Sequence, residues 1–192
     1  MPTSPPRAIT SENVLRSHIS QEIFPRIRRG LRAGFNQLAT LNLVDDLTCV
    51  SFDVGECAMI LNPFTLDMSF YQLGVPVGTG PNRAPGAIKP SWKWSTAMAT
   101  HPRIDVRTEY RQPLSQVNWY MKQHHSRYGF LMTERELLVF RRLDDNGNLE
   151  LAAPIPFTSG GNATQPQLTV LLALWYLGML AATDQGGDRW YM

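Results

Sequence analysis

Cysteine is scarce in this chain, and the features typical of secreted and membrane proteins are missing. The two cysteines, Cys49 and Cys57, have a spacing that fits no metal-binding pattern. The first twenty residues contain no apolar segment of the kind that a signal peptide carries. The longest apolar run, residues 168–182, is too short for a membrane span and fits a buried helix. We therefore expect free thiols, an intracellular location in nucleus or cytoplasm, and no membrane partner.

Charge is also limited, which leaves the partner class open. Lys and Arg number 18 against 16 Asp and Glu, for a net charge of +2. A strongly basic domain would by itself indicate nucleic acid, whereas this balance only permits it. An arginine-rich stretch fits either a solvated helix face or a set of phosphate contacts. Its members are Arg26, Arg28, Arg29 and Arg32.

The sequence also lacks a Ser-His-Asp pattern, a Walker-type loop and zinc-ligand spacing.

The length and the apolar periodicity predict one α/β domain. A chain of 192 residues suffices for one core, and we expect it over residues 11–185, with a flexible tail at 1–10 and another tail at 186–192. Helices are expected where apolar residues recur every three or four positions, at 11–24, 26–41, 113–126 and 168–182. Strands are expected at 48–52, 57–61, 66–73, 87–94, 128–133, 137–143 and 149–152. This order predicts a mixed central sheet flanked by helices.

An aspartate and a lysine on neighbouring predicted strands suggest a catalytic site. Asp67 follows a turn expected at residues 62–64, and Lys89 comes about twenty residues later. Metal-dependent phosphodiester hydrolysis needs carboxylates that hold Mg²⁺ and a lysine that orients the attacking water. Asp67 and Lys89 fit two of these positions. Taken alone, the same pair also fits a turn aspartate and a surface lysine.

The strand expected at 87–94 should place alternate side chains on opposite faces. One face would carry Ala87, Lys89, Ser91 and Lys93, and the other Ile88, Pro90, Trp92 and Trp94. We expect both tryptophans to pack in the core rather than to stack on bases, because they lie opposite Lys89.

Motifs in four stretches, at residues 66–70, 85–94, 112–120 and 127–141, occur in a recognisable order. They resemble the P-D-x-x-F, P-G-D-x-K-x-S-x-K-W, Q-x-x-x-Q and R-Y-G-F-I-x-T-x-x-E-L-V-x-x-R motifs of the PD-(D/E)xK, or restriction-endonuclease-like, nuclease superfamily. The resemblance is greatest to nuclease-like domains of uncharacterised fungal proteins, and it covers roughly residues 60–142. The stretch from Gln116 to Tyr120 also resembles the Q-x-x-x-Y motif of other members.

The resemblance implies a restriction-endonuclease-like three-layer sandwich and a nuclease that uses Mg²⁺ or Mn²⁺. Its partner would be DNA rather than RNA, and a homodimer is compatible with it. Asp67 would be a metal ligand, Lys89 the catalytic lysine, and Gln112 and Gln116 its supporting residues. A glutamate of the first helix would complete the metal site, and we prefer Glu22 to Glu12 because Glu22 lies nearer the helix end that should meet the sheet.

Ala87 is the main departure from the family pattern, which has an acidic metal ligand at this position. A methyl group cannot bind Mg²⁺, so we expect cleavage to be largely lost. The chain could be an engineered inactive nuclease, a natural pseudo-nuclease that binds DNA or protein, or a nuclease whose acid is supplied from elsewhere, with Asp53 and Glu56 available. A toxin or effector nuclease is a further alternative. Leu66, in place of the family's proline, matters little because proline is not a ligand.

Overall fold

Two helices open the described part of the chain, which comprises residues 8–61 and 65–192 of a computed structural model. α1 (Glu12–Glu22) begins after Ser11, whose hydroxyl accepts a hydrogen bond from the Val14 amide at 3.2 Å. α2 (Phe24–Thr40) follows almost directly, with Pro25 in its first turn, where a missing N–H costs little. The turn predicted at residues 62–64, and most of the predicted flexible tail, lie outside the described residues.

The sheet is mixed, as predicted, and it is open. Its strands are β1 (Val50–Val54), β2 (Met68–Gln72), β3 (Gly86–Ile88), β4 (Tyr128–Met132), β5 (Glu136–Arg142), β6 (Leu149–Leu151) and β7 (Ile155–Pro156). The order is β1-β2-β3-β4-β5-β6, and β7 also pairs with β5. β3 and β4 are parallel, whereas the other pairs are antiparallel. α3 (Ile104–Gln123) connects the two parallel strands, which need such a crossover.

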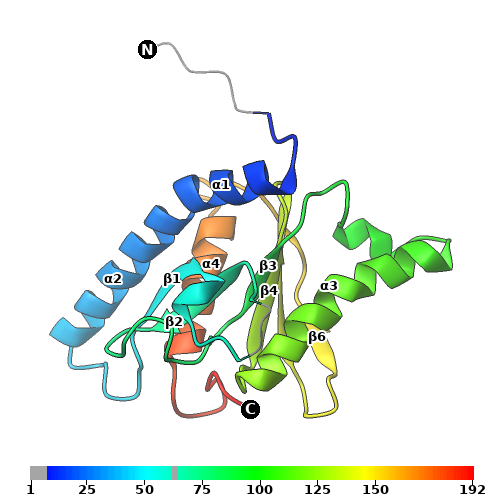
Figure 1. Ribbon diagram of the computed structural model, residues 1–192. Coiled ribbons are helices and arrows are strands. Elements are labelled where there is room, and N and C mark those ends of the chain that lie inside the picture. Colours follow the sequence, from blue (N-terminus) through cyan, green and yellow to red (C-terminus); the bar gives the residue numbers. More distant parts are fainter. Residues whose placement is uncertain (1–7, 62–64) are drawn as a thin grey trace.

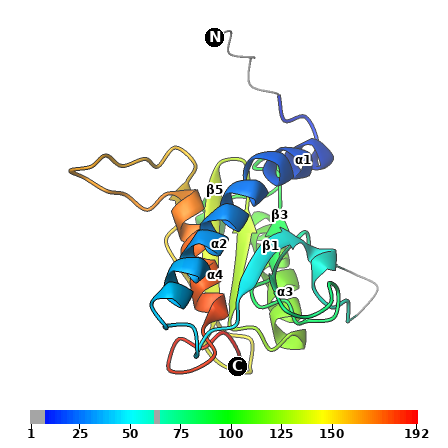
Figure 2. The same ribbon diagram turned by 90° about the vertical axis from the view of Figure 1, so that its left-hand side faces the viewer.

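Helices cover both faces of this sheet (Figures 1 and 2). α1, α2 and α4 (Val170–Ala182) lie on one face, and α3 lies on the other together with the short 3-10 helix η2 (Thr96–Thr100). The apolar run predicted as a buried helix forms α4, which packs against α2 and β1. Within the described ranges, each helix falls short of the length and apolar character that a bilayer crossing requires.

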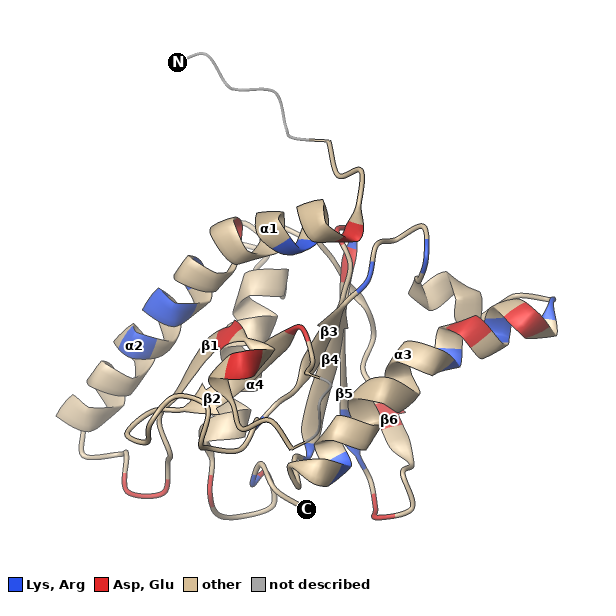
Figure 3. Ribbon diagram, viewed as in Figure 1, with Lys and Arg blue, Asp and Glu red and all other residues tan. Residues whose placement is uncertain are grey.

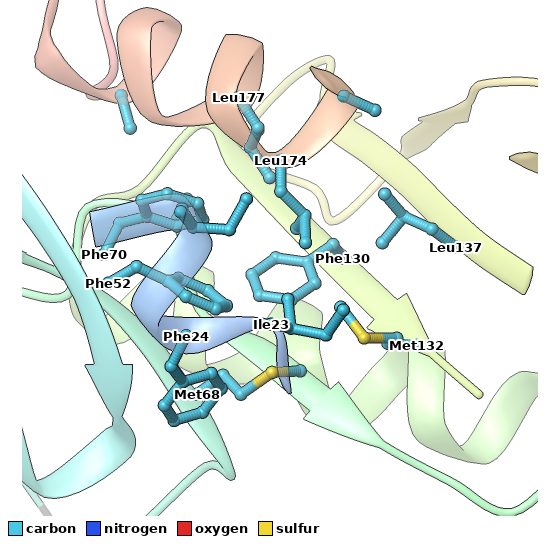
Figure 4. Close-up of a cluster of buried hydrophobic side chains, with 14 of the residues drawn as sticks. Ile23, Phe24, Phe52, Met68, Phe70, Phe130, Met132, Leu137, Leu174 and Leu177 are labelled. Atoms are coloured by element: carbon cyan, nitrogen blue, oxygen red, sulfur yellow. The ribbon is translucent and has the colours of Figure 1, made fainter. Parts of the chain in front are cut away.

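Four phenylalanine rings form the centre of the core between the sheet and the first helix layer (Figure 4). The Phe52 ring lies 4.9 Å from that of Phe24, 4.7 Å from that of Phe70 and 6.0 Å from that of Phe130. Burying each ring contributes about 1.5–3 kcal/mol. Gly86 of β3 lets the Phe130 ring approach, because a Cβ there would lie 2.1 Å from the ring.

Two strand predictions are wrong. Residues 57–61 form no strand, because β1 pairs directly with β2 and the chain leaves β1 through the 3-10 helix η1 (Gly55–Cys57). The strand predicted at 87–94 ends at Ile88, since the Pro90 carbonyl accepts hydrogen bonds from the amides of Lys93 and Trp94. The chain therefore turns where a regular alternation of faces was expected.

α3 begins at Ile104, well before the start predicted at Pro113. Pro113 is buried inside the helix, where it removes one backbone hydrogen bond. The inward stripe of the predicted helix is nevertheless confirmed, and its members Leu114, Val117, Tyr120 and Met121 are all buried.

The last seven residues are docked on the domain, in contrast to the predicted tail. The Met192 amide donates to the His125 carbonyl at 2.9 Å, and the Tyr128 hydroxyl donates to the Asp188 carbonyl at 3.1 Å. The guanidinium of the buried Arg83 lies 4.4 Å from the centre of the Trp190 ring and pairs with Asp184. These contacts fix the chain end against the start of β4.

His124 joins the end of α3 to the loop between β2 and β3. Its Nδ1 accepts a hydrogen bond from the Asn82 amide at 3.1 Å, and the Ser126 hydroxyl donates to the Asn82 carbonyl. The imidazole is buried, and burial, followed by the charge of His125, lowers its pKa from 6.5 to about 4.

We predict that the folded state loses stability as the pH falls from 6.5 towards 4. In this window the unfolded chain protonates His124 and the folded chain does not, so the loss approaches about 3 kcal/mol. Urea unfolding at several pH values measures it. His124→Asn keeps an acceptor without a titrating group and should flatten the profile, whereas His18→Asn, at an exposed position, should not. Equal slopes in all three proteins would contradict the prediction.

Candidate functional site

Asp67 lies directly before β2, and its carboxylate bridges to β3. One oxygen, Oδ2, accepts a hydrogen bond from the Ile88 amide at 2.7 Å. The other, Oδ1, pairs with the Arg16 guanidinium of α1 at 2.7 Å. The side chain of Asp67 is 10% exposed. The carboxylate is thus held beside the segment from Ala87 to Lys89, where the motif spacing predicts it.

Burial is the main influence on the charge of Asp67. It raises the pKa of the carboxyl above its usual value, and the nearby charge of Glu12 acts in the same direction. The hydrogen bond from Ile88 and the charges of Arg16 and Lys89 oppose this rise without cancelling it. The ionised carboxylate therefore depends on the cations around it.

Glu12 completes a group of charges that we call the Asp67 cluster, which consists of Glu12, Arg16, Asp67, Lys89 and Lys93. The Glu12 carboxylate pairs with Arg16 at 2.9 Å and with Lys93 at 3.2 Å. Burial alone would raise its pKa, but these hydrogen bonds and the charge of Lys89 hold it below the usual value. Figure 3 shows the basic segments after β3 beside the start of α1.

The preference for Glu22 over Glu12 is corrected by this arrangement. Glu12, Arg16 and Ser20 recur every fourth residue and form one stripe of α1; Arg16 and Ser20 line the cavity next to Asp67. Glu22 lies about 200° around the helix axis from Ser20. It is exposed and pairs with Arg26 at 3.3 Å.

Ala87 and Tyr120 lie in the apolar cluster between the sheet and α3. Ala87 is 1% exposed, so the position expected to bind metal offers a buried methyl group. The Tyr120 hydroxyl is buried and has no hydrogen-bond partner among the described residues. Burial and then the charge of Asp67 raise the pKa of this hydroxyl. The cluster that contains Ala87 therefore also contains a buried hydroxyl donor that is unused among the described residues.

The residues present do not fit a resident Mg²⁺ ion. Both oxygens of Asp67 already have partners, and position 87 supplies none. Across residues 8–61 and 65–192, no three His, Cys, Asp or Glu side chains converge as metal ligands would. Of the two substitute acids, Asp53 pairs with Arg28 at 3.2 Å. Glu56 lines the same cavity of about 240 Å³ as Asp67.

The glutamines predicted to support the lysine lie on the surface of α3. Gln112 and Gln116 are both exposed, although they share a helix stripe with the buried Tyr120. Of Gln116 and Tyr120, only Tyr120 is therefore buried, in the same cluster as Ala87.

Arg16 is the residue of this site that the sequence did not identify. Its spacing of four from Glu12 indicates a helical ion pair, but that spacing does not show which side of the helix meets the sheet. No protein-family model and no curated protein matches the sequence. The resemblance to a nuclease superfamily therefore rests on the sequence motifs alone.

We predict that Arg16→Ala lowers the free energy of unfolding by about 1–2 kcal/mol at pH 7, because it leaves a largely buried carboxylate without its cation. The loss of stability caused by Arg16→Ala should be smaller in acid. Removing Arg16 raises the pKa of Asp67 in the folded state further, so protonation of this carboxyl then favours the folded state.

Chemical denaturation of Arg16→Ala, Asp67→Asn and the double variant measures the coupling between the two side chains. The double variant should recover part of the loss. Arg26→Ala is the matched control, because its pair with Glu22 is exposed and should contribute little. Additive effects of the two single changes would show that the pair does not stabilise the fold.

Proposed function

We propose that this chain is a restriction-endonuclease-like nuclease domain whose metal site is disabled by Ala87, and that it binds DNA without cleaving it. The supporting observation is the 2.7 Å hydrogen bond from the Ile88 amide to the Asp67 carboxylate. It fixes an acid beside the strand on which the family motif has its second acid and its lysine. A mixed sheet with helices on both faces agrees with this assignment.

The surroundings of position 87 support the loss of an acid. Among the described residues the buried Tyr120 hydroxyl has no acceptor, and an unpaired donor is costly in a protein interior. An aspartate at position 87 would supply a carboxylate in the same cluster of side chains. With alanine there, Arg16 supplies the cation that balances Asp67. The charge of Asp67 is therefore balanced in the folded chain even though position 87 carries no acid.

DNA binding is supported by cations at and near the Asp67 cluster. Arg16 is 44% exposed and Lys93 is 58% exposed, so both reach solvent despite their ion pairs. The pair of Lys93 with Glu12 is exposed at the lysine and contributes little, so a phosphate can compete for Lys93. The exposed part of the Arg16 guanidinium can contact a phosphate while Arg16 keeps its pair with Asp67. Further exposed arginines lie on α2, and they are Arg26, Arg29 and Arg32.

Glu56 favours a second candidate function, a nuclease that is active because its acid comes from elsewhere. It is exposed at the rim of the cavity that Asp67 also lines. In that case the chain as it stands would cleave DNA weakly, and Glu56→Gln would abolish the cleavage.

The test compares the present chain with Ala87→Asp, Ala87→Asn and Ala87→Asp/Lys89→Ala. We predict that the present chain binds labelled DNA in a salt-dependent way and leaves plasmid and single-stranded DNA intact in Mg²⁺ or Mn²⁺. Ala87→Asp should cleave, whereas the double variant should not. Mn²⁺ should raise the melting temperature of Ala87→Asp, because an ion that binds only the folded state stabilises it.

Ala87→Asn has nearly the shape of the aspartate without its charge, and is the matched control. It should show neither cleavage nor stabilisation by Mn²⁺. If the present chain binds DNA and all variants stay inactive, the domain is a binding module and its site is not a disabled nuclease site. If it binds no DNA at low salt, the proposed function is wrong.

A further inference from the structure

The turn after β3 presents an indole ring to solvent beside the Asp67 cluster. Trp92 is 55% exposed, although sequence alternation places it on a buried face together with Trp94. Trp94 is 1% exposed; its ring stacks on Tyr110 at 5.6 Å, and its indole N–H donates to the Tyr110 carbonyl at 2.9 Å. The turn thus buries one tryptophan and exposes the other.

The backbone that carries Trp92 is held on both sides. Before it, the Ser91 amide donates to the Glu134 carboxylate at 2.9 Å, and the Ser91 hydroxyl donates to the other oxygen of that carboxylate. After it, the amides of Lys93 and Trp94 donate to the Pro90 carbonyl at 2.9 and 3.1 Å. Such a turn orients an exposed indole before any ligand arrives, which lowers the entropy cost of binding.

Lys93 connects the segment that carries this indole to the candidate site. Lys93 follows it in sequence and reaches Glu12 of α1 at 3.2 Å, and Glu12 in turn contacts Arg16. Figure 3 shows this basic loop beside the start of α1. An exposed aromatic residue followed in the chain by an exposed cation is complementary to a nucleotide, which offers a flat base next to a charged phosphate.

We propose that Trp92 is a stacking platform for an unpaired nucleobase, with Lys93 and Arg16 contacting the adjoining phosphates. The domain would therefore prefer single-stranded DNA to duplex DNA. Bases inside a duplex are covered by their neighbours, so an indole stacks on them only after they are unpaired. This inference deepens the proposed function and rests on it.

The experiment measures binding of a labelled single-stranded oligonucleotide and of a duplex of equal length by fluorescence anisotropy. Trp92→Ala should weaken single-strand binding roughly tenfold or more, because stacking contributes about 1–3 kcal/mol per base. Duplex binding should change less than about twofold, since it depends on the phosphates. Trp92→Phe keeps an aromatic ring and should restore most of the affinity.

Trp119→Ala is the matched control, because Trp119 is also an exposed tryptophan, 45% accessible, but lies on α3. It should leave both affinities unchanged. The melting temperature of each variant checks folding, and an exposed position should tolerate the change.

The outcomes separate this inference from the proposed function. If the parent chain binds DNA and Trp92→Ala binds single strands equally well, stacking is refuted and the proposed function stands. If the parent chain binds neither form, the proposed function itself fails. A concentration-dependent dimer that Trp92→Ala abolishes would also overturn the inference, because a second copy would then cover the indole.

Discussion

The hydrogen bond and ion pair of the Asp67 carboxylate connect three parts of the fold that are distant in sequence. Arg16 comes from α1, Asp67 precedes β2, and the Ile88 amide belongs to β3. A buried carboxylate is stable only when its oxygens are paired, so the position of α1 over the end of the sheet and the ionisation of Asp67 depend on each other. The candidate site is therefore part of the structure that holds α1 in place.

The sequence predicted the sheet and its helices well where periodicity was strong. The apolar stripe of α2 is buried, and the apolar run at residues 168–182 forms the largely buried helix α4, so local pattern and global fold agree there. Strands β4 and β5 also form where apolar runs predicted them, although all five residues of β4 are buried and do not alternate. The region after Ile88 shows the limit of this method. A period of two describes a strand, but it does not reveal that Ser91 will be anchored by Glu134, which is remote in sequence. That contact turns the chain and decides which tryptophan is buried.

The same limit applies to the site. The spacing of Asp67 and Lys89 predicted that their strands are neighbours, because antiparallel pairing of consecutive strands is a local event. Neither Arg16 nor the buried Arg83 was identified, since an arginine becomes part of a buried network only through partners brought by the fold. For Arg83 those partners are Asp184 and Trp190, near the end of the chain. For the same reason, the polar composition of residues 186–192 does not predict that they dock on the domain.

The residue at position 87 sets the charge balance around Asp67. Two carboxylates, at positions 67 and 87, would repel each other and raise each other's pKa unless a cation lay between them. A single carboxylate needs one positive charge, and Arg16 already supplies it. The methyl group at position 87 therefore removes the electrostatic demand for a divalent ion while the apolar packing against α3 is kept. With this residue the charge of Asp67 is balanced without a metal ion, and Arg16, Lys93 and Trp92 remain exposed to solvent.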